Sequence, residues 1–161
     1  MLPYRNPLPD IYTMPSNTFS MHHSSVILLV DDRPENLFAL ESILSDSHRL
    51  LLNATSGVET LLMTELEDVD RILLDYRLGD MTGIEVIRKL RARAATARVP
   101  VILVTAADDG ELPSLSEFEV GSVDILRKPL DVEEVQSMVN LYEEMALLRK
   151  EVRPGLRRMF R

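Results

Sequence analysis

Four apolar runs in this sequence are each followed by side chains that could act together in catalysis. These side chains are Asp31 and Asp32 after the first run, Asp75 after the third, Thr105 after the fourth and Lys128 after the fifth. A parallel sheet brings the carboxyl ends of its strands to one edge, where residues far apart in sequence converge. Three carboxylates, a hydroxyl and an ammonium group would then meet, which favours metal-assisted phosphoryl chemistry on an aspartate.

The acidic residues suit a magnesium ion. Mg²⁺ prefers oxygen ligands in near-octahedral geometry and usually combines one or two carboxylates with waters and a phosphate. A divalent cation also removes the repulsion between converging carboxylates and screens an incoming phosphoryl group. A carboxylate can accept a phosphoryl group covalently, and catalysis then depends mainly on positioning and electrostatics. Thr105 and Lys128 would supply the hydroxyl and the cation.

Short apolar runs alternate with amphipathic segments from Val26 onward, a pattern typical of buried parallel strands with crossover helices. The predicted strands are Val26 to Val30, Leu50 to Ala54, Arg71 to Leu74, Val101 to Val104 and Val123 to Leu126. Helix starts are indicated by Pro34 and by three cap pairs, namely Ser56 with Glu59, Thr82 with Glu85 and Asp131 with Glu134. The fold class predicted is α/β, a flavodoxin-like, doubly wound sheet of five parallel strands with five helices.

Apolar positions of the first three helices are expected to cover the sheet. They are Leu37, Leu40, Ile43 and Leu44, then Leu61, Leu62 and Leu66, then Ile84, Ile87 and Leu90. Between Ala106 and Glu119, Gly110 and Pro113 predict a fourth helix that is short or displaced. The last helix is predicted to run from Asp131 to about Val152, where Pro154 and Gly155 would stop it.

That last helix would be longer than a small sheet needs for cover. Its apolar residues recur at alternating spacings of three and four, as a coiled-coil seam requires: Met138, Leu141, Met145, Leu148 and Val152. We therefore expect a homodimer through this helix, or docking on a partner helix. About two heptads alone do not establish a coiled coil.

Composition predicts one domain with tails. The 161 residues include no cysteine, which excludes disulfides and thiolate sites, and the net charge of −8 argues against a whole-surface nucleic-acid binder. No apolar stretch approaches a membrane span, and no secretory segment opens the chain, so a cytoplasmic location is expected. We divide the chain into a flexible tail (1–24), the main domain (25–137), a helical extension with a possible coiled coil (138–153) and a basic tail (154–161).

From about Val26 to Lys150 the chain resembles the receiver domains of two-component response regulators. The likeness is carried by the acidic pair within Asp31-Asp32-Arg33-Pro34-Glu35-Asn36, by Asp75 with Gly83 after it, by Thr105, and by Lys128-Pro129. The opening segment resembles that of receivers in hybrid kinases and multidomain regulators. The family has a five-stranded parallel sheet with five helices, and its Lys-Pro peptide bond is typically cis.

The resemblance implies a role for each position. Asp75 would accept the phosphoryl group from the phosphohistidine of a sensor histidine kinase or phosphotransfer protein. Asp32, Asp75 and the backbone carbonyl of Arg77 would bind Mg²⁺ directly, Asp31 would act mainly through water, Thr105 would bond a phosphoryl oxygen, and Lys128 would pair with the phosphate. Such a module catalyses its own phosphorylation and dephosphorylation while serving mainly in signalling, by phosphorylation-dependent protein interaction or dimerisation.

One departure from the family affects signal transmission. Ile125 stands three residues before Lys128, where the family usually carries Tyr or Phe. We therefore expect transmission through Thr105, the loop from Ala106 to Ser116, and helix displacement. A degenerate receiver that acts as a phosphorylation-independent scaffold is the alternative. A haloacid dehalogenase-like phosphatase is disfavoured, because Arg77 stands where that class needs a second aspartate.

Overall fold

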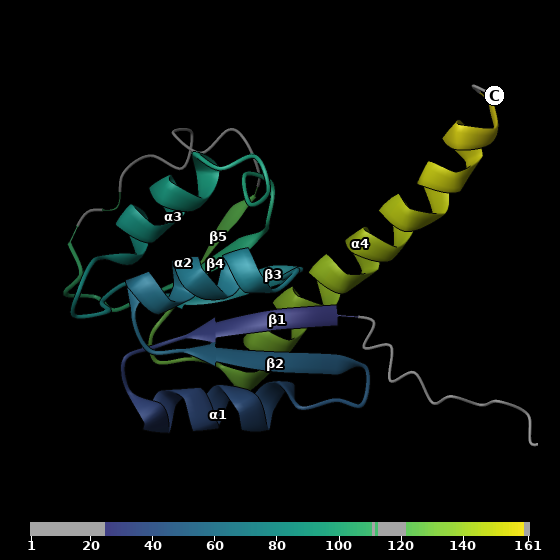
Figure 1. Cartoon of the computed structure of the whole chain (residues 1–161). Coiled ribbons are helices and arrows are strands. Elements are labelled where there is room, and N and C mark those ends of the chain that lie inside the picture. Colours follow the sequence, from purple (N-terminus) through teal and green to yellow (C-terminus); the bar gives the residue numbers. More distant parts are fainter. Residues whose placement is uncertain (1–24, 111, 113–121, 160–161) are drawn as a thin grey trace, which may run out of the picture.

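The structure, a computed structural model, describes residues 25–110, 112 and 122–159, with side chains described up to residue 149. Its five strands form one parallel sheet in the order β2-β1-β3-β4-β5 (Figure 1). The strands are β1 (Ser25–Val30), β2 (Arg49–Ala54), β3 (Arg71–Asp75), β4 (Val101–Thr105) and β5 (Val123–Arg127). The predicted doubly wound α/β fold is therefore confirmed.

Helices cover both faces of the sheet, and the described residues contain α1 (Pro34–Leu44), α2 (Gly57–Leu66), α3 (Gly83–Arg91) and α4 (Val132–Met159). One core cluster joins α3 to one face of β1, β3 and β4, and half-buried residues of α2 pack against it. The other cluster joins α1 and the first part of α4 to the opposite face. The short helix expected between Ala106 and Glu119 falls largely on residues outside the described ranges.

The helix starts follow the predicted cap pairs. Thr82 and Glu85 form a reciprocal capping box at α3. Ser56 accepts a hydrogen bond from the backbone of Glu59, but the Glu59 carboxylate reaches Thr55 rather than the cap. Each arrangement gives a first-turn N–H group a partner that the helix itself cannot provide.

The face predicted for α2 was wrong at two positions. Leu62 and Leu66 are 52% and 69% exposed, whereas Thr60 and Thr64 are buried. The Thr60 hydroxyl donates to the carbonyl of the N-cap residue Ser56 at 2.7 Å, and the Thr64 hydroxyl donates to that of Leu61 at 2.9 Å. Burying a hydroxyl costs little once it is hydrogen-bonded, so α2 can turn its threonines inward. Leu61, by contrast, packs against the core as predicted.

The predicted end of the last helix near Val152 was also wrong. Helix α4 continues through Pro154 and Gly155 to Met159 and projects away from the sheet (Figure 1). A proline inside a helix removes one backbone hydrogen bond and distorts the helix locally, but it does not always end the helix. None of the helices in the described ranges combines the length and hydropathy needed to span a bilayer.

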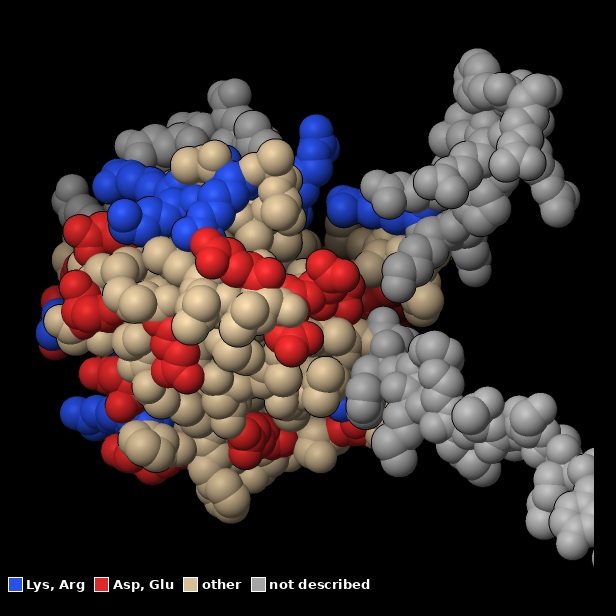
Figure 2. All heavy atoms as spheres, in the orientation of Figure 1, with Lys and Arg blue, Asp and Glu red and all other residues tan. Residues whose placement is uncertain are grey.

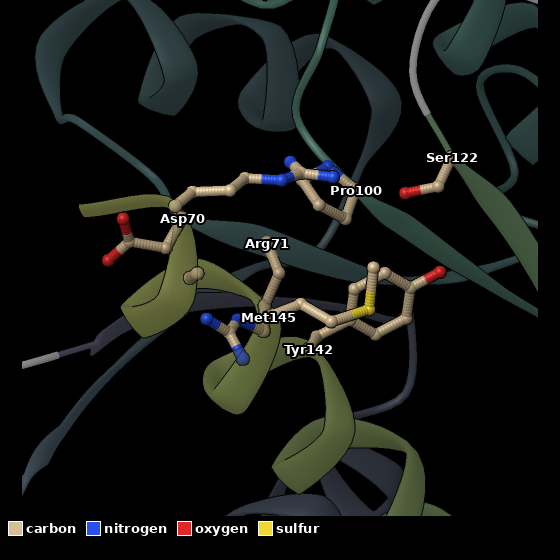
Figure 3. Close-up of a pocket in the computed structure, with 8 residues that line it drawn as sticks. Asp70, Arg71, Pro100, Ser122, Tyr142 and Met145 are labelled. Carbon is tan, nitrogen blue, oxygen red and sulfur yellow. The ribbon is translucent and has the colours of Figure 1, made fainter. Parts of the chain in front are cut away.

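The first part of α4 is anchored at the edge where the strands begin. Arg49 donates to the carboxylate of Glu143 at 2.8 Å, and the buried guanidinium of Arg71 donates to the carbonyl of Val139 at 3.1 Å. The hydroxyl of Tyr142 donates to Asp124. Figure 3 shows this edge of the sheet, where Arg71, Tyr142 and Met145 lie beside a cavity that Asp70, Pro100 and Ser122 also line. These contacts fix α4 to the strands at the edge opposite Asp75.

Candidate functional site

Three carboxylates meet at the carboxyl edge of the sheet. Asp31 and Asp32 follow β1, and Asp75 is the last residue of β3, which pairs with β1. One oxygen from each carboxylate lies within 4.8 Å of the others, and Asp31 and Asp75 are buried. The potential ligands that these three residues offer are carboxylate oxygens, which is the ligand chemistry that Mg²⁺ prefers. The residues present therefore fit a magnesium ion.

Asp31 is held by the start of the first helix. Its Oδ1 accepts a hydrogen bond from the backbone N–H of Arg33 at 2.9 Å, and its Oδ2 accepts one from the side-chain amide of Asn36 at 3.0 Å. Pro34 sits at the first helical position, so the chain turns directly from strand to helix. This role of Asn36 was not predicted, although the residue lies within the opening segment Asp31-Asp32-Arg33-Pro34-Glu35-Asn36.

Lys128 comes to the site from the end of β5. Its ammonium lies 2.7 Å from Oδ1 of Asp75, and its backbone N–H donates to the carbonyl of Thr105 at 2.7 Å. The Lys128-Pro129 peptide bond is cis, as the family resemblance implied. Burial raises the pKa of Asp75, and the charges of Asp31 and Asp32 add to this while Lys128 opposes it.

Thr105 ends β4, next to β3 in the sheet. It is buried, and its hydroxyl has no hydrogen-bond partner among the described residues. A buried hydroxyl without a partner is costly, so it suits an oxygen acceptor brought by a ligand. The ends of four strands thus supply Asp31, Asp75, Thr105 and Lys128.

The loop after Asp75 is tied to its neighbours. The Asp80 carboxylate accepts from the backbone N–H groups of Gly57 and Val58 at 2.9 and 3.0 Å, and these two bonds lower the pKa of Asp80. Gly83 lies so close to the site that a Cβ there would stand 2.9 Å from the carbonyl oxygen of Asp75. Small size at this position therefore allows α3 to start against the end of β3.

The side chain of Arg77 bonds to the loop after β4, whereas that of Asp80 bonds to the start of α2. Its Nε donates to Oδ1 of Asp109 at 2.6 Å, and its Nη2 donates to the carbonyl of Asp108 at 2.8 Å. The other oxygen of Asp109 accepts from the backbone N–H of Ala106 at 2.5 Å. Asp109 was not predicted as a site residue, because no signal in the sequence links it to Arg77.

In the described part of the chain, Asp75 lines two openings. One, of about 420 Å³, lies between α1 and the segment after β5 and is also lined by Asp31, Asn36 and Lys128. The other, of about 320 Å³, is lined by Asp32, Asp75, Arg77, Ala106, Asp108, Asp109 and Lys128, among others.

Lys and Arg side chains gather over α3, where the last turn carries Arg88 and Lys89 (Figure 2). Cations at a helix carboxyl end offset its dipole, so this patch needs no nucleic acid to account for it.

Curated relatives share most of this chain. PilH of Pseudomonas aeruginosa is 31% identical over 114 residues, which cover 71% of this chain and 93% of PilH. Response regulator PleD of Caulobacter vibrioides is 37% identical over 108 residues, which cover 67% of this chain. The matched segments are 24% of PleD and 26% of a probable cyclic di-GMP phosphodiesterase of Vibrio cholerae, so the likeness spans about a quarter of those proteins.

Solved structures agree with the fold. The receiver domain of a sensor histidine kinase from Pseudomonas aeruginosa PAO1, crystallised with magnesium in its active site cleft, matches with a TM-score of 0.63. It is 30% identical, and the match covers 74% of this chain and 98% of that domain. The family model of the response regulator receiver domain matches residues 27–140. With its parallel sheet and the acidic cluster at the carboxyl edge, this chain belongs to the response regulator receiver family.

Proposed function

We propose that this receiver accepts a phosphoryl group on Asp75 from the phosphohistidine of a sensor histidine kinase or a phosphotransfer protein. The observation that carries the proposal is the convergence of three carboxylates within 4.8 Å with the Lys128 ammonium 2.7 Å from Asp75. A bond forms between an Asp75 oxygen and phosphorus as the bond from phosphorus to the donor nitrogen breaks. The histidine keeps the electron pair of that broken bond.

Each side chain has a proposed part in this step. Asp32, Asp75 and the Arg77 carbonyl would hold Mg²⁺, whose charge would neutralise that of the phosphoryl oxygens. Asp31 already accepts two hydrogen bonds, which supports a role through water. The hydroxyl of Thr105 would donate to one phosphoryl oxygen, and Lys128 would move from the Asp75 carboxylate to pair with another. The same site would later admit water for hydrolysis of the acyl phosphate.

Intact mass after incubation with acetyl phosphate and Mg²⁺ tests the proposal. A phosphate adduct is expected on the wild type, and it should be lost in Asp75→Asn. Asp68→Asn is the matched control, because Asp68 is exposed and does not line either opening to Asp75. No adduct on the wild type would instead favour the alternative, a degenerate receiver acting as a phosphorylation-independent scaffold.

The output proposed is interaction in the cytoplasm between two copies through α4. Leu141, Met145 and Leu148 lie four and three residues apart and are exposed, whereas Val135 and Val139 of the same helix are buried in the core. An exposed stripe with this spacing matches a two-helix seam. Light scattering with beryllofluoride, an acyl-phosphate mimic, and Mg²⁺ should show a dimer. Leu148→Lys should keep it monomeric, while Glu144→Lys, an exposed change on the same helix, should not.

A further inference from the structure

Asp109 is more buried than its surroundings would suggest. Its side chain is 4% exposed, while that of the adjacent Asp108 is 77% exposed. Both of its carboxylate oxygens accept short hydrogen bonds, from the backbone N–H of Ala106 at 2.5 Å and from Nε of Arg77 at 2.6 Å. Ala106 directly follows Thr105, so this carboxylate lies on the first amide beyond the end of β4.

The same carboxylate lines the cavity of about 320 Å³ that contains Asp75 and Lys128. A backbone N–H and a guanidinium that converge on one group form an anion-binding site, because both donate hydrogen bonds and the guanidinium is positively charged. A carboxylate and a phosphoryl group present the same chemistry to such donors, namely negatively charged oxygen acceptors. In this structure the Asp109 carboxylate occupies that anion-binding site.

We propose that Asp109 is an internal competitor for the phosphoryl group, a proposal that rests on the function proposed above. While Asp75 is unmodified, Asp109 occupies the N–H of Ala106 and the guanidinium of Arg77. A phosphoryl group on Asp75 would repel Asp109 and take the N–H of Ala106. The segment after β4 would then be released, and Asp109 would set the affinity of the pocket for the phosphoryl group.

The alternative is a purely structural role in which Asp109 only closes a local turn, since its backbone N–H also donates to the carbonyl of Ala106 at 3.2 Å. A turn residue would contribute to stability without affecting anion affinity. The ion pair with Arg77 does not decide between these roles, because the Arg77 side chain is 60% exposed and exposed ion pairs contribute little. The two roles are separated by measuring anion binding apart from stability.

The whole chain is titrated with beryllofluoride in saturating Mg²⁺, and binding is monitored by backbone NMR. A separate titration with Mg²⁺ alone measures the affinity for the metal ion. Asp109→Ala should bind beryllofluoride roughly tenfold more tightly, as expected when one competing hydrogen bond is removed. Mg²⁺ affinity should stay within about twofold of wild type, since Asp109 is not among the clustered carboxylates. Asp109→Asn keeps an acceptor for the Ala106 N–H but loses the charge, so its affinity should be intermediate.

Asp108→Ala is the matched control, because the Asp108 carboxylate is exposed and lies 3.6 Å from the Arg77 guanidinium. Among the described residues, the N–H of Ala106 donates to Asp109 and not to Asp108. Its affinity for beryllofluoride should equal that of the wild type. The amide resonance of Ala106 should shift on binding in the wild type and start already displaced in Asp109→Ala. Equal or weaker binding by both Asp109 variants would overturn the proposal, and a wild type that binds no beryllofluoride would instead overturn the function on which it rests.

Discussion

Replacing Asp75 with asparagine should stabilise the protein in the absence of a metal ion. The pKa of Asp75 is raised by burial and by two neighbouring carboxylates, so the folded state disfavours the ionised form. A raised pKa means that stability is greatest while the group is protonated and is lost as the pH rises through the folded pKa. At pH 7 the ionised carboxylate therefore costs stability, and Asp75→Asn removes that cost.

The size of the effect follows from the separations in the site. Repulsion from each neighbouring carboxylate at the 4.8 Å limit is about 3.5 kcal/mol at an effective dielectric constant of 20. Attraction to Lys128 at 2.7 Å is about 6 kcal/mol on the same basis. These opposing effects leave roughly 1 kcal/mol of net repulsion, and the burial of Asp75 adds a desolvation cost. We expect Asp75→Asn to raise the free energy of unfolding by about 1–2 kcal/mol.

Urea denaturation at pH 7 without divalent cations measures this difference, with Asp68→Asn as the exposed control. The gap between Asp75→Asn and wild type should narrow as the pH falls toward the ordinary range for aspartate, because the wild-type carboxyl is then neutral as well. Mg²⁺ at a hundred times its Kd should add about 2.7 kcal/mol to the wild type and less to the variant. A variant less stable than wild type at pH 7 without metal would refute this account of the site.

Three further substitutions test the surroundings of the site and the anchor of α4. Gly83→Ala should destabilise by about 1–3 kcal/mol in urea denaturation and slow phosphorylation by acetyl phosphate, because a Cβ would stand 2.7 Å from Leu103 and 2.9 Å from the Asp75 carbonyl. Gly79→Ala, where no atom lies within 4 Å but φ is +77°, should cost about 1–2 kcal/mol without that slowing. Burial and the hydrogen bond to Asp124 raise the pKa of Tyr142 from 10.0 to about 12. The free energy of unfolding of the wild type should therefore fall as the pH rises between these two values. This fall should exceed that of Tyr142→Phe by about 2–3 kcal/mol. Equal pH profiles for the two proteins would contradict this assignment to Tyr142.

The strands could be predicted from sequence almost to the residue, and the reason is physical. A strand buried on both faces must be apolar throughout, as Ile72 to Leu74 are, and its polar successor marks the sheet edge. The proposed site residues were predicted in a similar way, because each ends or follows an apolar run. That these residues lie at one edge follows from the parallel topology of the sheet, which the alternation of strands and helices predicts.

The errors arose where burial depends on tertiary fit rather than on residue type. Helix α2 can turn Thr60 inward because a hydrogen bond to the carbonyl of the N-cap residue Ser56 satisfies its hydroxyl, and Leu66 is exposed although it is apolar. Asn36 and Asp109 were not predicted because a side chain whose hydrogen-bond partner lies in a loop leaves no periodic signal in the sequence. Helix α4 passed the predicted stop at Pro154 because proline disfavours a helix interior without forbidding it.

The departure at Ile125 can be related to these bonds. Ile125 is half-buried on β5, opposite Leu103 of β4 in the sheet register, and its side chain has no hydroxyl or aromatic ring to present to Thr105. The ends of β4 and β5 are joined instead by the bond from the Lys128 backbone to Thr105 and lead into the bond between Asp109 and Ala106. A phosphoryl group that draws Lys128 toward itself would therefore act on both strand ends through the backbone, with no aromatic rotation required.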